Sequence, residues 1–307
     1  MESTDMSQGE IVQPGVGLNE IIGREIREFV RTSPLNRLES FDNEPIFEAP
    51  LVGFADGDDP LFVEYKTIVH RDHFTPREIL EKHLSEASGT GPVFWPSVGV
   101  ISYVLPVNCK TIAVNAREKE GPSLRWNHTR WKGQEFNDKL SRHLVSFLDG
   151  KGIRAVAPSL TPGFKIMRGS DGIASNWSHR HMAYAAGLGT FSLNEGFITP
   201  KGMAMRCGSV VVGAKLEPTP RPYGGPFANC LFRAGYKCGA CIKRCPGGAL
   251  SEKGHDKLKC LSILFEEQKP WLQGAHGPGY IGEYAGCGLC QTGVPCESCI
   301  PAREHGK

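Results

Sequence analysis

Cysteine is the residue type whose spacing carries the most chemical information in this 307-residue chain. Of its eleven cysteines, Cys109 and Cys207 stand alone, and the other nine fall between Cys230 and Cys299. The N-terminal residues lack the basic and apolar pattern of an export signal, so we expect a cytoplasmic protein with reduced thiols. In such a protein, a cluster of cysteines favours metal binding over disulfides.

The motif Cys238-Gly-Ala-Cys241-Ile-Lys-Arg-Cys245-Pro matches the second half of the ligand run in bacterial ferredoxins. Two residues between a pair of thiolates let both reach one iron-sulfur cube, whereas the cysteine before proline binds the other cube. Cys230 precedes this motif by a longer loop, and we take it as the missing first ligand. The spacing therefore predicts [4Fe-4S] clusters, which carry electrons one at a time.

The later cysteines supply the rest of the ligands that two clusters need. Cys260 stands alone, Cys287-Gly-Leu-Cys290 repeats the two-residue spacing, and two more cysteines follow. Two cubes take eight thiolates and nine are present, so one cysteine is spare. We expect one cube to be bound by Cys230, Cys238, Cys241 and Cys296, with Cys299 as the alternative to Cys296. We expect the other cube to be bound by Cys245, Cys260, Cys287 and Cys290.

Zinc is the alternative metal for so many clustered cysteines. Zinc ribbons arrange their ligands in two pairs and have no use for the Cys-Pro at Cys245 or for the isolated Cys260, so the pattern favours iron-sulfur clusters. Cys109 and Cys207 lie in apolar stretches, and we expect both to be buried structural residues.

Helices and strands alternate in the chain that precedes these cysteines. Apolar residues at helical spacing predict helices over residues 19–32, 136–148 and 176–186. A capping box at Thr75 predicts the start of a further helix. Apolar β-branched runs predict strands over residues 98–105, 153–157 and 203–212. This alternation predicts an α/β (α+β) domain over residues 20–215, after a flexible N-terminus of residues 1–19.

A run rich in proline and glycine, residues 217–227, predicts a linker into the cysteine region. Residues 216–307 have few apolar side chains from which to build a core, so this second domain is expected to fold only with a cofactor. Within it, Gly247-Gly248-Ala249-Leu250 is expected to form a short helix between the two clusters.

Charge and hydropathy bear on the partners of the protein. The net charge is +2 at pH 7 and no long block of one sign occurs, so nucleic acid and anionic membranes are not expected as partners. No window approaches the eighteen or so apolar residues of a membrane-spanning helix. We therefore expect a soluble protein that acts on a small-molecule substrate.

Two stretches resemble a known group of proteins. One is the cysteine region, and the other runs from His179-Arg180-His181 through Gly187-Leu-Gly189 to Asn194. Over about residues 175–300 they resemble the epoxyqueuosine reductases and their larger relatives, the corrinoid-dependent reductive dehalogenases. The resemblance implies a nitroreductase-like, corrinoid-binding N-terminal domain followed by a bacterial-ferredoxin-like module with two [4Fe-4S] clusters. It also implies a bound cobalamin that receives electrons from the nearer cluster.

The resemblance also indicates site residues, with two departures from the family pattern. Reduction at a cobalt centre needs a proton donor beside it. The family's catalytic acid would fall near Ile173, where the nearest carboxylate is Asp171, and His179 stands where the family has glutamate. We therefore expect Asp171 and His179 to be catalytic. Cofactor contacts are expected from Arg180, His181, Gly187, Gly189 and Asn194.

Helix geometry limits these site residues. Positions 179 and 181 of a helix point about 200° apart, so only one of these two histidines can face a cofactor. Gly187-Leu-Gly189 is too short for a dinucleotide fingerprint and most simply ends the preceding helix.

Two functions remain open at this point. The first is an iron-sulfur oxidoreductase that relays electrons from a ferredoxin or flavodoxin, through two [4Fe-4S] clusters, to a corrinoid or directly to a substrate. The alternative is a non-catalytic electron-transfer or corrinoid-activating protein that serves a partner enzyme. The large N-terminal domain favours the enzyme, because electron transfer alone would not need a pocket.

Overall fold

A four-stranded antiparallel sheet forms the centre of the molecule, which a computed structural model describes over residues 17–89, 94–169 and 172–303. The strand order is β3-β4-β10-β5. The strands are β3 (Leu51–Asp56), β4 (Gly99–Pro106), β10 (Met205–Val212) and β5 (Ala155–Val156). Strands β4 and β10 pair along their whole length, from Met205 opposite Pro106 to Val212 opposite Gly99.

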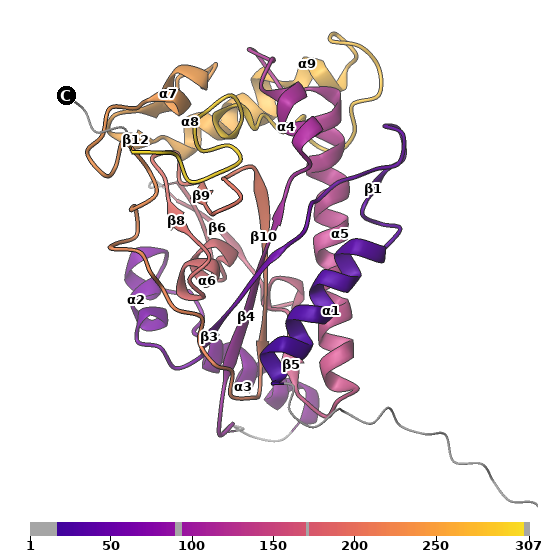
Figure 1. The fold of residues 1–307 in the computed structure, drawn as a ribbon, viewed down its shortest axis with the longest axis vertical. Coiled ribbons are helices and arrows are strands. Elements are labelled where there is room, and N and C mark those ends of the chain that lie inside the picture. The colour runs from indigo at the N-terminus through magenta and orange to yellow at the C-terminus, as the bar shows by residue number, and fades with distance from the viewer. Residues whose placement is uncertain (1–16, 90–93, 170–171, 304–307) are drawn as a thin grey trace, which may run out of the picture.

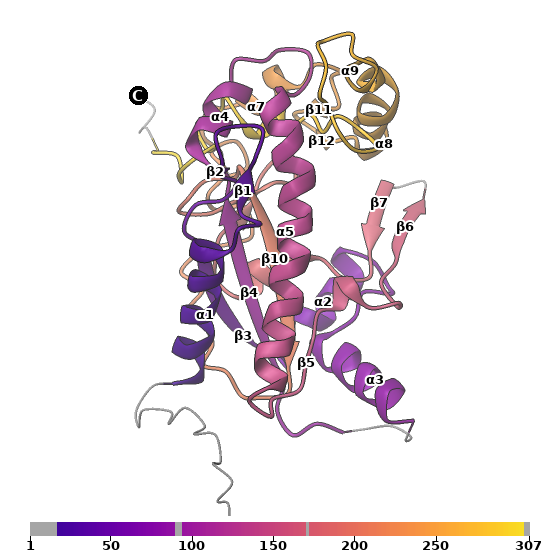
Figure 2. The ribbon, with the colours of Figure 1, turned by 90° about the vertical axis from the view of Figure 1, so that its right-hand side faces the viewer.

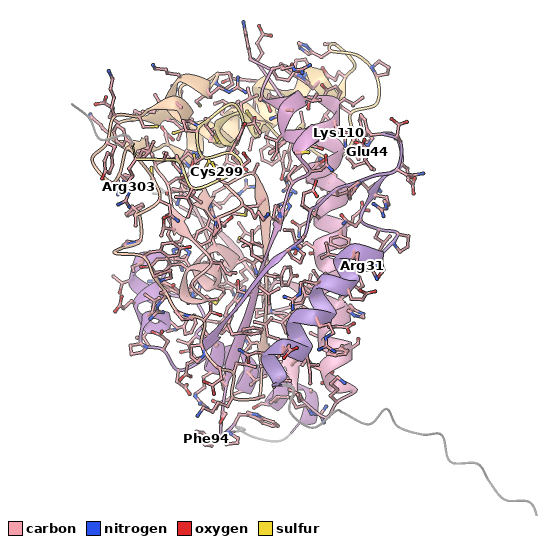
Figure 3. All side chains as sticks on the ribbon, in the orientation of Figure 1. Arg31, Glu44, Phe94, Lys110, Cys299 and Arg303 are labelled. Atoms are coloured by element: carbon pink, nitrogen blue, oxygen red, sulfur yellow. The ribbon has the colours of Figure 1, made fainter. Side chains whose placement is uncertain are left out.

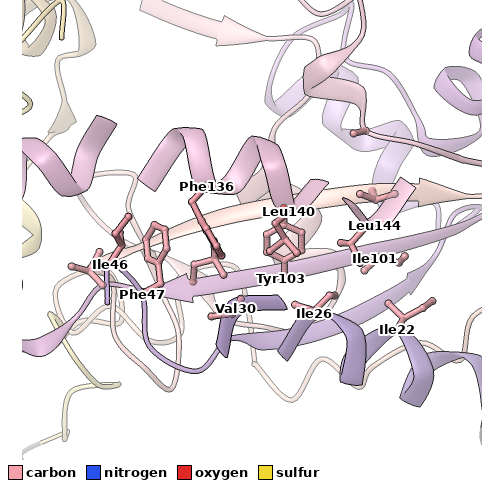
Figure 4. Close-up of a cluster of buried hydrophobic side chains, with 14 of the residues drawn as sticks. Ile22, Ile26, Val30, Ile46, Phe47, Ile101, Tyr103, Phe136, Leu140 and Leu144 are labelled. Atoms are coloured by element: carbon pink, nitrogen blue, oxygen red, sulfur yellow. The ribbon is translucent and has the colours of Figure 1, made fainter. Parts of the chain in front are cut away.

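Two helices cover one face of this sheet, namely α1 (Leu18–Thr32) and α5 (Leu124–Asp149). Side chains alternate between the two faces of a strand, so the odd-numbered residues of β4, such as Ile101 and Tyr103, point to this side. They pack against Ile26 of α1 and Leu140 of α5, as Figure 4 shows. The first large apolar cluster of the protein lies here.

The opposite face is covered by α2 (Leu61–Ile68), α3 (Pro76–Ser88) and α6 (His179–Ala185). Figure 2 shows α2 and α3 on the side of the sheet away from α1. The even-numbered residues Val100 and Val104 of β4 point to this side. Because both faces are covered, every residue of β4 is buried, and the strand appears in the sequence as an apolar run in which Ser102 is the one polar side chain besides the Tyr103 hydroxyl. The capping box of Thr75 starts α3 as expected.

Short elements complete the region before residue 216. They are β1 (Arg37–Leu38), β2 (Glu44–Pro45), α4 (Cys109–Asn115), a 3-10 turn (Pro158–Leu160), β6 (Ile166–Gly169), β7 (Gly172–Ser175), β8 (Thr190–Phe191) and β9 (Phe197–Ile198). The pairs β1-β2, β6-β7 and β8-β9 are separate two-stranded sheets.

The cysteine segment, residues 216–303, lies across one end of the central sheet (Figure 1). Its elements are α7 (Ala240–Arg244), β11 (Leu250–Ser251), β12 (Gly254–His255), α8 (Lys257–Ser262), a π-helical turn (Ile263–Glu267), α9 (Lys269–Leu272) and a 3-10 turn (Leu289–Gln291). Most of the segment has no regular structure, and the run 217–227 has none.

The mixed fold expected from the sequence is confirmed, but two local expectations are wrong. Gly247 to Leu250 form a turn that enters β11, not a helix. Gly248 has a φ of +62°, and a Cβ on Gly247 would lie 2.2 Å from the Ile263 side chain, so this glycine pair serves a tight turn. Cys109 is exposed at the start of α4, whereas the expected burial is found for Cys207.

Two further expectations concern the N-terminal residues and membrane-spanning helices. Residues 1–16 of the expected flexible N-terminus lie outside the described residues. Among the helices of the described ranges, none is long and apolar enough to cross a membrane.

Candidate functional site

Eight of the cysteines gather in two groups of four at the end of the sheet. The first cysteine group lines one cavity and consists of Cys230, Cys238, Cys241 and Cys296. The second cysteine group lines a larger cavity and consists of Cys245, Cys260, Cys287 and Cys290. Within each group the thiols act electrostatically on one another, which requires that they lie close together. The membership of each group is the one that the sequence spacing predicts.

Cys296 and Cys299 have different surroundings. Cys296 lines the cavity of the first group, and its Sγ lies 3.3 Å from Sδ of Met203. The Met203 amide also donates a 2.9 Å hydrogen bond to the Cys296 carbonyl oxygen. Cys299 is exposed and lies outside the residues that line the cavity (Figure 3). Of these two candidates, the geometry therefore joins Cys296 to the first group.

The second group is held against the sheet region by its backbone. The Asn194 side-chain amide donates to the Cys290 carbonyl oxygen at 2.9 Å. Gly288 adopts a φ of +64°, and a Cβ there would lie 2.1 Å from the Trp126 ring. The loop between Cys287 and Cys290 can approach α5 this closely only because it carries glycine.

Burial keeps the thiols of Cys241 and Cys260 protonated in the absence of metal. Burial, and next the thiols of Cys230 and Cys238, raise the pKa of Cys241 to about 11. Burial, and next the thiols of Cys287 and Cys245, raise the pKa of Cys260 to about 11. Only thiolates bind metal, so loading either group must release protons.

The four thiols of each group line one cavity. Among the described residues, no set of three or more His, Cys, Asp or Glu side chains is arranged to hold a single metal ion. A [4Fe-4S] cube takes one thiolate at each of its four irons, so its ligands are distributed around the cube.

Arg244 connects the cysteine segment to the rest of the protein. Its guanidinium donates to the carbonyl oxygens of Glu118 at 2.7 Å and Asn115 at 3.3 Å. It also donates to the carbonyl oxygens of Thr292 at 3.0 Å and Leu289 at 3.3 Å. One side chain thus joins the α4–α5 connection to the loop that carries the last cysteines.

Helix α5 holds the loop before Cys287. The Asn127 side chain donates to the carbonyl oxygens of Ile281 and Ala285 and accepts from the Ile281 amide, at 2.8–3.0 Å. The indole of Trp131 donates to the Tyr284 carbonyl oxygen at 3.0 Å. These bonds fix one wall of the second group to a rigid helix.

The two residues expected to be catalytic are Asp171 and His179. Asp171 lies outside the described residues. His179 is partly buried, and its Nδ1 lies 2.7 Å from Oγ of Ser209. Burial, with a smaller effect from Arg206, lowers the pKa of His179 to about 4, so the ring is neutral at pH 7. His179 does not line either cysteine cavity.

The expected cofactor contacts separate into two sets. Arg180 and Asn194 line the cavity of the second group. His181 instead points toward Tyr65, with ring centroids 4.9 Å apart. Gly187 has a φ of +71° and ends α6 in a Schellman motif. In this motif the Gly187 amide donates a hydrogen bond to the Tyr184 carbonyl oxygen, and the Leu188 amide donates to the Ala183 carbonyl oxygen.

Gly189 has a packing role in the structure. A Cβ on Gly189 would lie 2.3 Å from the Ile198 carbonyl oxygen. Neither Gly187 nor Gly189 lines a cysteine cavity. Close backbone approach alone accounts for glycine at position 189.

The larger cavity has a volume of about 300 Å³ and opens between the second group, α5 and β10. Sequence reasoning missed three of its polar lining residues, Arg130, Arg206 and Tyr284. Arg206 donates to the Arg130 carbonyl oxygen across 76 positions of sequence, and Arg130 donates to the Tyr284 hydroxyl across 154. No local spacing could have indicated these pairs.

Comparison with known proteins places this geometry in context. No family model and no curated protein matches the chain. Its structure is similar to that of epoxyqueuosine reductase from Bacillus subtilis, with 18% identity, a TM-score of 0.43, and coverage of 93% of this chain and 68% of the other. The enzyme from Streptococcus thermophilus gives 16% identity and a TM-score of 0.41, over 89% and 65% of the two chains.

A further epoxyqueuosine reductase structure, solved with an epoxyqueuosine-modified tRNA stem loop, gives 18% identity and a TM-score of 0.44. The match includes 90% of this chain and 65% of the other. This chain therefore spans about two thirds of the length of these proteins. The solved structures to which this chain is similar thus belong to the group that its sequence motifs resemble.

Proposed function

We propose that this protein is an iron-sulfur reductase in which each cysteine group holds one [4Fe-4S] cluster. A ferredoxin or flavodoxin would supply single electrons, and a substrate would receive them in the cavity beside the second group. The observation that carries this proposal is the gathering of eight cysteines in two groups of four, one of which lines a cavity of about 300 Å³. This cavity extends beyond the cysteines to α5 and β10, and such an extension favours an enzyme over an electron carrier that serves a partner.

The position of the two groups suggests the direction of electron flow. When bound, the clusters accept and release one electron at a time. Cys238 of the first group is exposed, so a donor protein can approach that group from solvent. The second group faces the cavity, where the substrate would bind. Electrons would then enter at the first group and leave at the second.

Hydrogen bonds to the sulfur ligands affect how readily a cluster is reduced. The Ala249 amide donates to Sγ of Cys245 at 3.2 Å. Such a bond disperses negative charge on the sulfur and raises the reduction potential. Ala249 also lines the cavity, so the turn at Gly247-Gly248 directs this amide toward the second group.

Reduction of a substrate needs protons as well as electrons. His179 and Asp171 remain proposals from the sequence resemblance, but the geometry favours His255, because its side chain lines the cavity. His255 Nδ1 lies 3.4 Å from Oε2 of Glu195, and Lys257 pairs with the other oxygen of that carboxylate at 3.2 Å. This arrangement orients the imidazole at the cavity wall.

The cavity beside the second group is too small to enclose a whole corrinoid. About 300 Å³ is at the lower end of the range for pockets that hold drug-sized ligands, and a corrinoid with its amide side chains is far larger. We therefore assign no step to cobalamin and propose that the substrate is reduced directly. Anaerobic incubation with cobalamin should leave it unretained on gel filtration, with an unshifted visible spectrum.

The substrate class is the remaining part of the proposal. Our expectation against nucleic acid rested on net charge, and a structure similar to this one contains a modified tRNA stem loop, so that expectation has no support from the comparisons. Size favours a small molecule or a small group that enters the cavity. Substrate tests should include RNA as a second class.

Metal analysis tests the two clusters. Anaerobically prepared protein should contain about eight irons and eight sulfides per chain. Cys241→Ser changes the first cysteine group and Cys290→Ser changes the second, so each variant should lose about half of the iron. Cys299→Ser, which changes an exposed cysteine, should keep it all. Zinc in place of iron, or loss of a cluster in Cys299→Ser but not in Cys296→Ser, would overturn the proposal or its ligand set.

A further inference from the structure

We propose that the cavity beside the second cysteine group is an anion-binding site, in which Arg130 and Arg206 bind a carboxylate or phosphate of a small molecule. The inference deepens the proposed function and rests on it only for the claim that the bound anion belongs to the substrate.

The charged side chains that line this cavity are of one sign. Apart from the cysteines, they are Arg130, Arg180 and Arg206, and the lining contains no aspartate or glutamate among the described residues. Arg180 is exposed and donates to the Glu195 carbonyl oxygen. Arg130 and Arg206 are half-buried at the cavity wall, and neither has a direct counter-charge among the described residues.

The hydrogen bonds of these two arginines leave donors free. Arg206 Nη2 donates to the Arg130 carbonyl oxygen at 2.8 Å, and Arg130 Nη2 donates to the Tyr284 hydroxyl. Within the part of the chain that the structure describes, neither forms an ion pair. Arg130 Nη1 and the Thr129 hydroxyl are buried there without any hydrogen-bond partner. Both residues line the cavity, where an anion would accept from them.

Two like charges at one cavity wall are unfavourable without a counter-ion. Burial, and next the charge of Arg130, lower the pKa of Arg206 to about 9. Asp138 acts on Arg206 only at longer range, and its carboxylate accepts from the Gln134 side chain at 2.8 Å. An anion between the guanidinium groups would offset this repulsion and satisfy the free donors.

Arg130 is also held in position before any ligand arrives. Its guanidinium carbon lies 5.2 Å from the centroid of the Tyr284 ring and 5.4 Å from that of Trp131. These contacts restrict the rotamers of a long side chain, which reduces the entropy lost on binding. The rest of the wall, including Phe47, Val107 and Met205, is apolar and suits the remainder of a small organic acid or phosphate ester.

A competing explanation is that the arginines only balance the negative charge of the cysteine thiolates across the cavity. The two explanations differ in one measurable respect. Charge balance alone gives no binding of added anions, whereas an anion site links anion binding to cluster reduction. An anion held beside the second cluster disfavours its reduction, so binding should lower one midpoint potential.

The test uses the protein with both clusters in place, whose iron content is measured on the same sample. Inorganic phosphate and acetate are titrated by calorimetry, and both cluster potentials are followed by EPR with and without saturating phosphate. Phosphate, acetate or both should bind and should lower the potential of one cluster only. A tenfold preference for the oxidised form corresponds to a shift of about 59 mV for a one-electron couple.

Variants assign the site to the arginines. Arg130→Gln and Arg206→Gln should each weaken anion binding by about tenfold to a hundredfold and remove the anion dependence of the potential. Arg142→Gln, which changes an exposed arginine on the same helix, should change neither. Arg130→Lys keeps the charge and should retain part of the affinity.

Two results would overturn the inference. They are absence of binding by both anions to wild-type protein with full iron content, and unchanged binding in both glutamine variants. If a variant fails to fold, the titration of the wild-type protein with anions still tests the inference. Absence of iron in the same sample contradicts the proposed function instead, so the two failures remain distinct.

Discussion

The sheet region, residues 17–215, and the cysteine segment, residues 216–303, are held together by different physical means. The sheet region has two apolar clusters, one on each face of its sheet. The third cluster is small, and it takes Leu193, Ile198 and Met203 from the sheet region and only Cys230 and Val294 from the segment. The segment therefore depends on hydrogen bonds to the sheet region and on what its cysteines bind.

Iron removal should separate the two regions most clearly. Anaerobic chelation should raise the rate of proteolysis within residues 216–303 by roughly two orders of magnitude or more, because metal binding supplies the folding free energy of such a segment. The sheet region should keep its secondary structure, as followed by circular dichroism and mass spectrometry of the fragments. Equal protection with and without iron would mean that the segment folds by itself.

Leu140→Ala should destabilise the sheet region and leave the cysteine segment unchanged, which is the opposite of the effect expected from iron removal. Leu140 is fully buried between α5 and the sheet, so the cavity left by this change should cost about 2–5 kcal/mol in the free energy of unfolding of the sheet region. Iron content should be unchanged. Loss of iron at a temperature where the sheet region is still folded would show that the two regions are more tightly coupled than we infer.

Arg244→Met should have a smaller effect, confined to the boundary between the regions. The change removes a guanidinium that donates to four carbonyl oxygens on both sides, at a cost of about 2–4 kcal/mol. Hydrogen exchange should speed up near Thr292 and Asn115. Lys243→Met, which changes the exposed neighbour, is the control and should leave exchange unchanged.

His73 offers a pH-dependent effect within the sheet region. Its side chain is fully buried, stacked on Trp177, and burial lowers its pKa to about 4. The unfolded chain binds a proton near pH 6.5, so stability is lost as the pH falls from 6.5 toward 4. At pH 5 the loss from His73 should be roughly 2 kcal/mol.

Unfolding by denaturant at pH 7 and pH 5 checks this prediction. His73→Gln should reduce the loss, and the remainder should come from His179 and His181, whose pKa values burial also lowers. His83→Gln on α3 is the matched control. An equal pH dependence in wild type and His73→Gln would contradict the assignment.

Local sequence signals predicted the elements that depend on near neighbours. The helical spacing of Ile22, Ile26 and Val30, the capping box of Thr75, and the apolar run of β4 all correspond to observed elements. The short pairs β6-β7 and β8-β9 were missed, because two to four residues give no period to detect. The antiparallel order of the sheet was also not predictable, since it depends on which strands meet.

The spacing of the cysteines by itself determined the membership of the two groups apart from the choice between Cys296 and Cys299, because a short loop between two thiols limits which of them can reach the same volume. Only the tertiary structure separated Cys296 from Cys299, through the contact with Met203 on another segment. Only it brought Arg130, Arg206 and Tyr284 to one cavity. Contacts between residues far apart in sequence are set by the packing of whole elements, which no local pattern records.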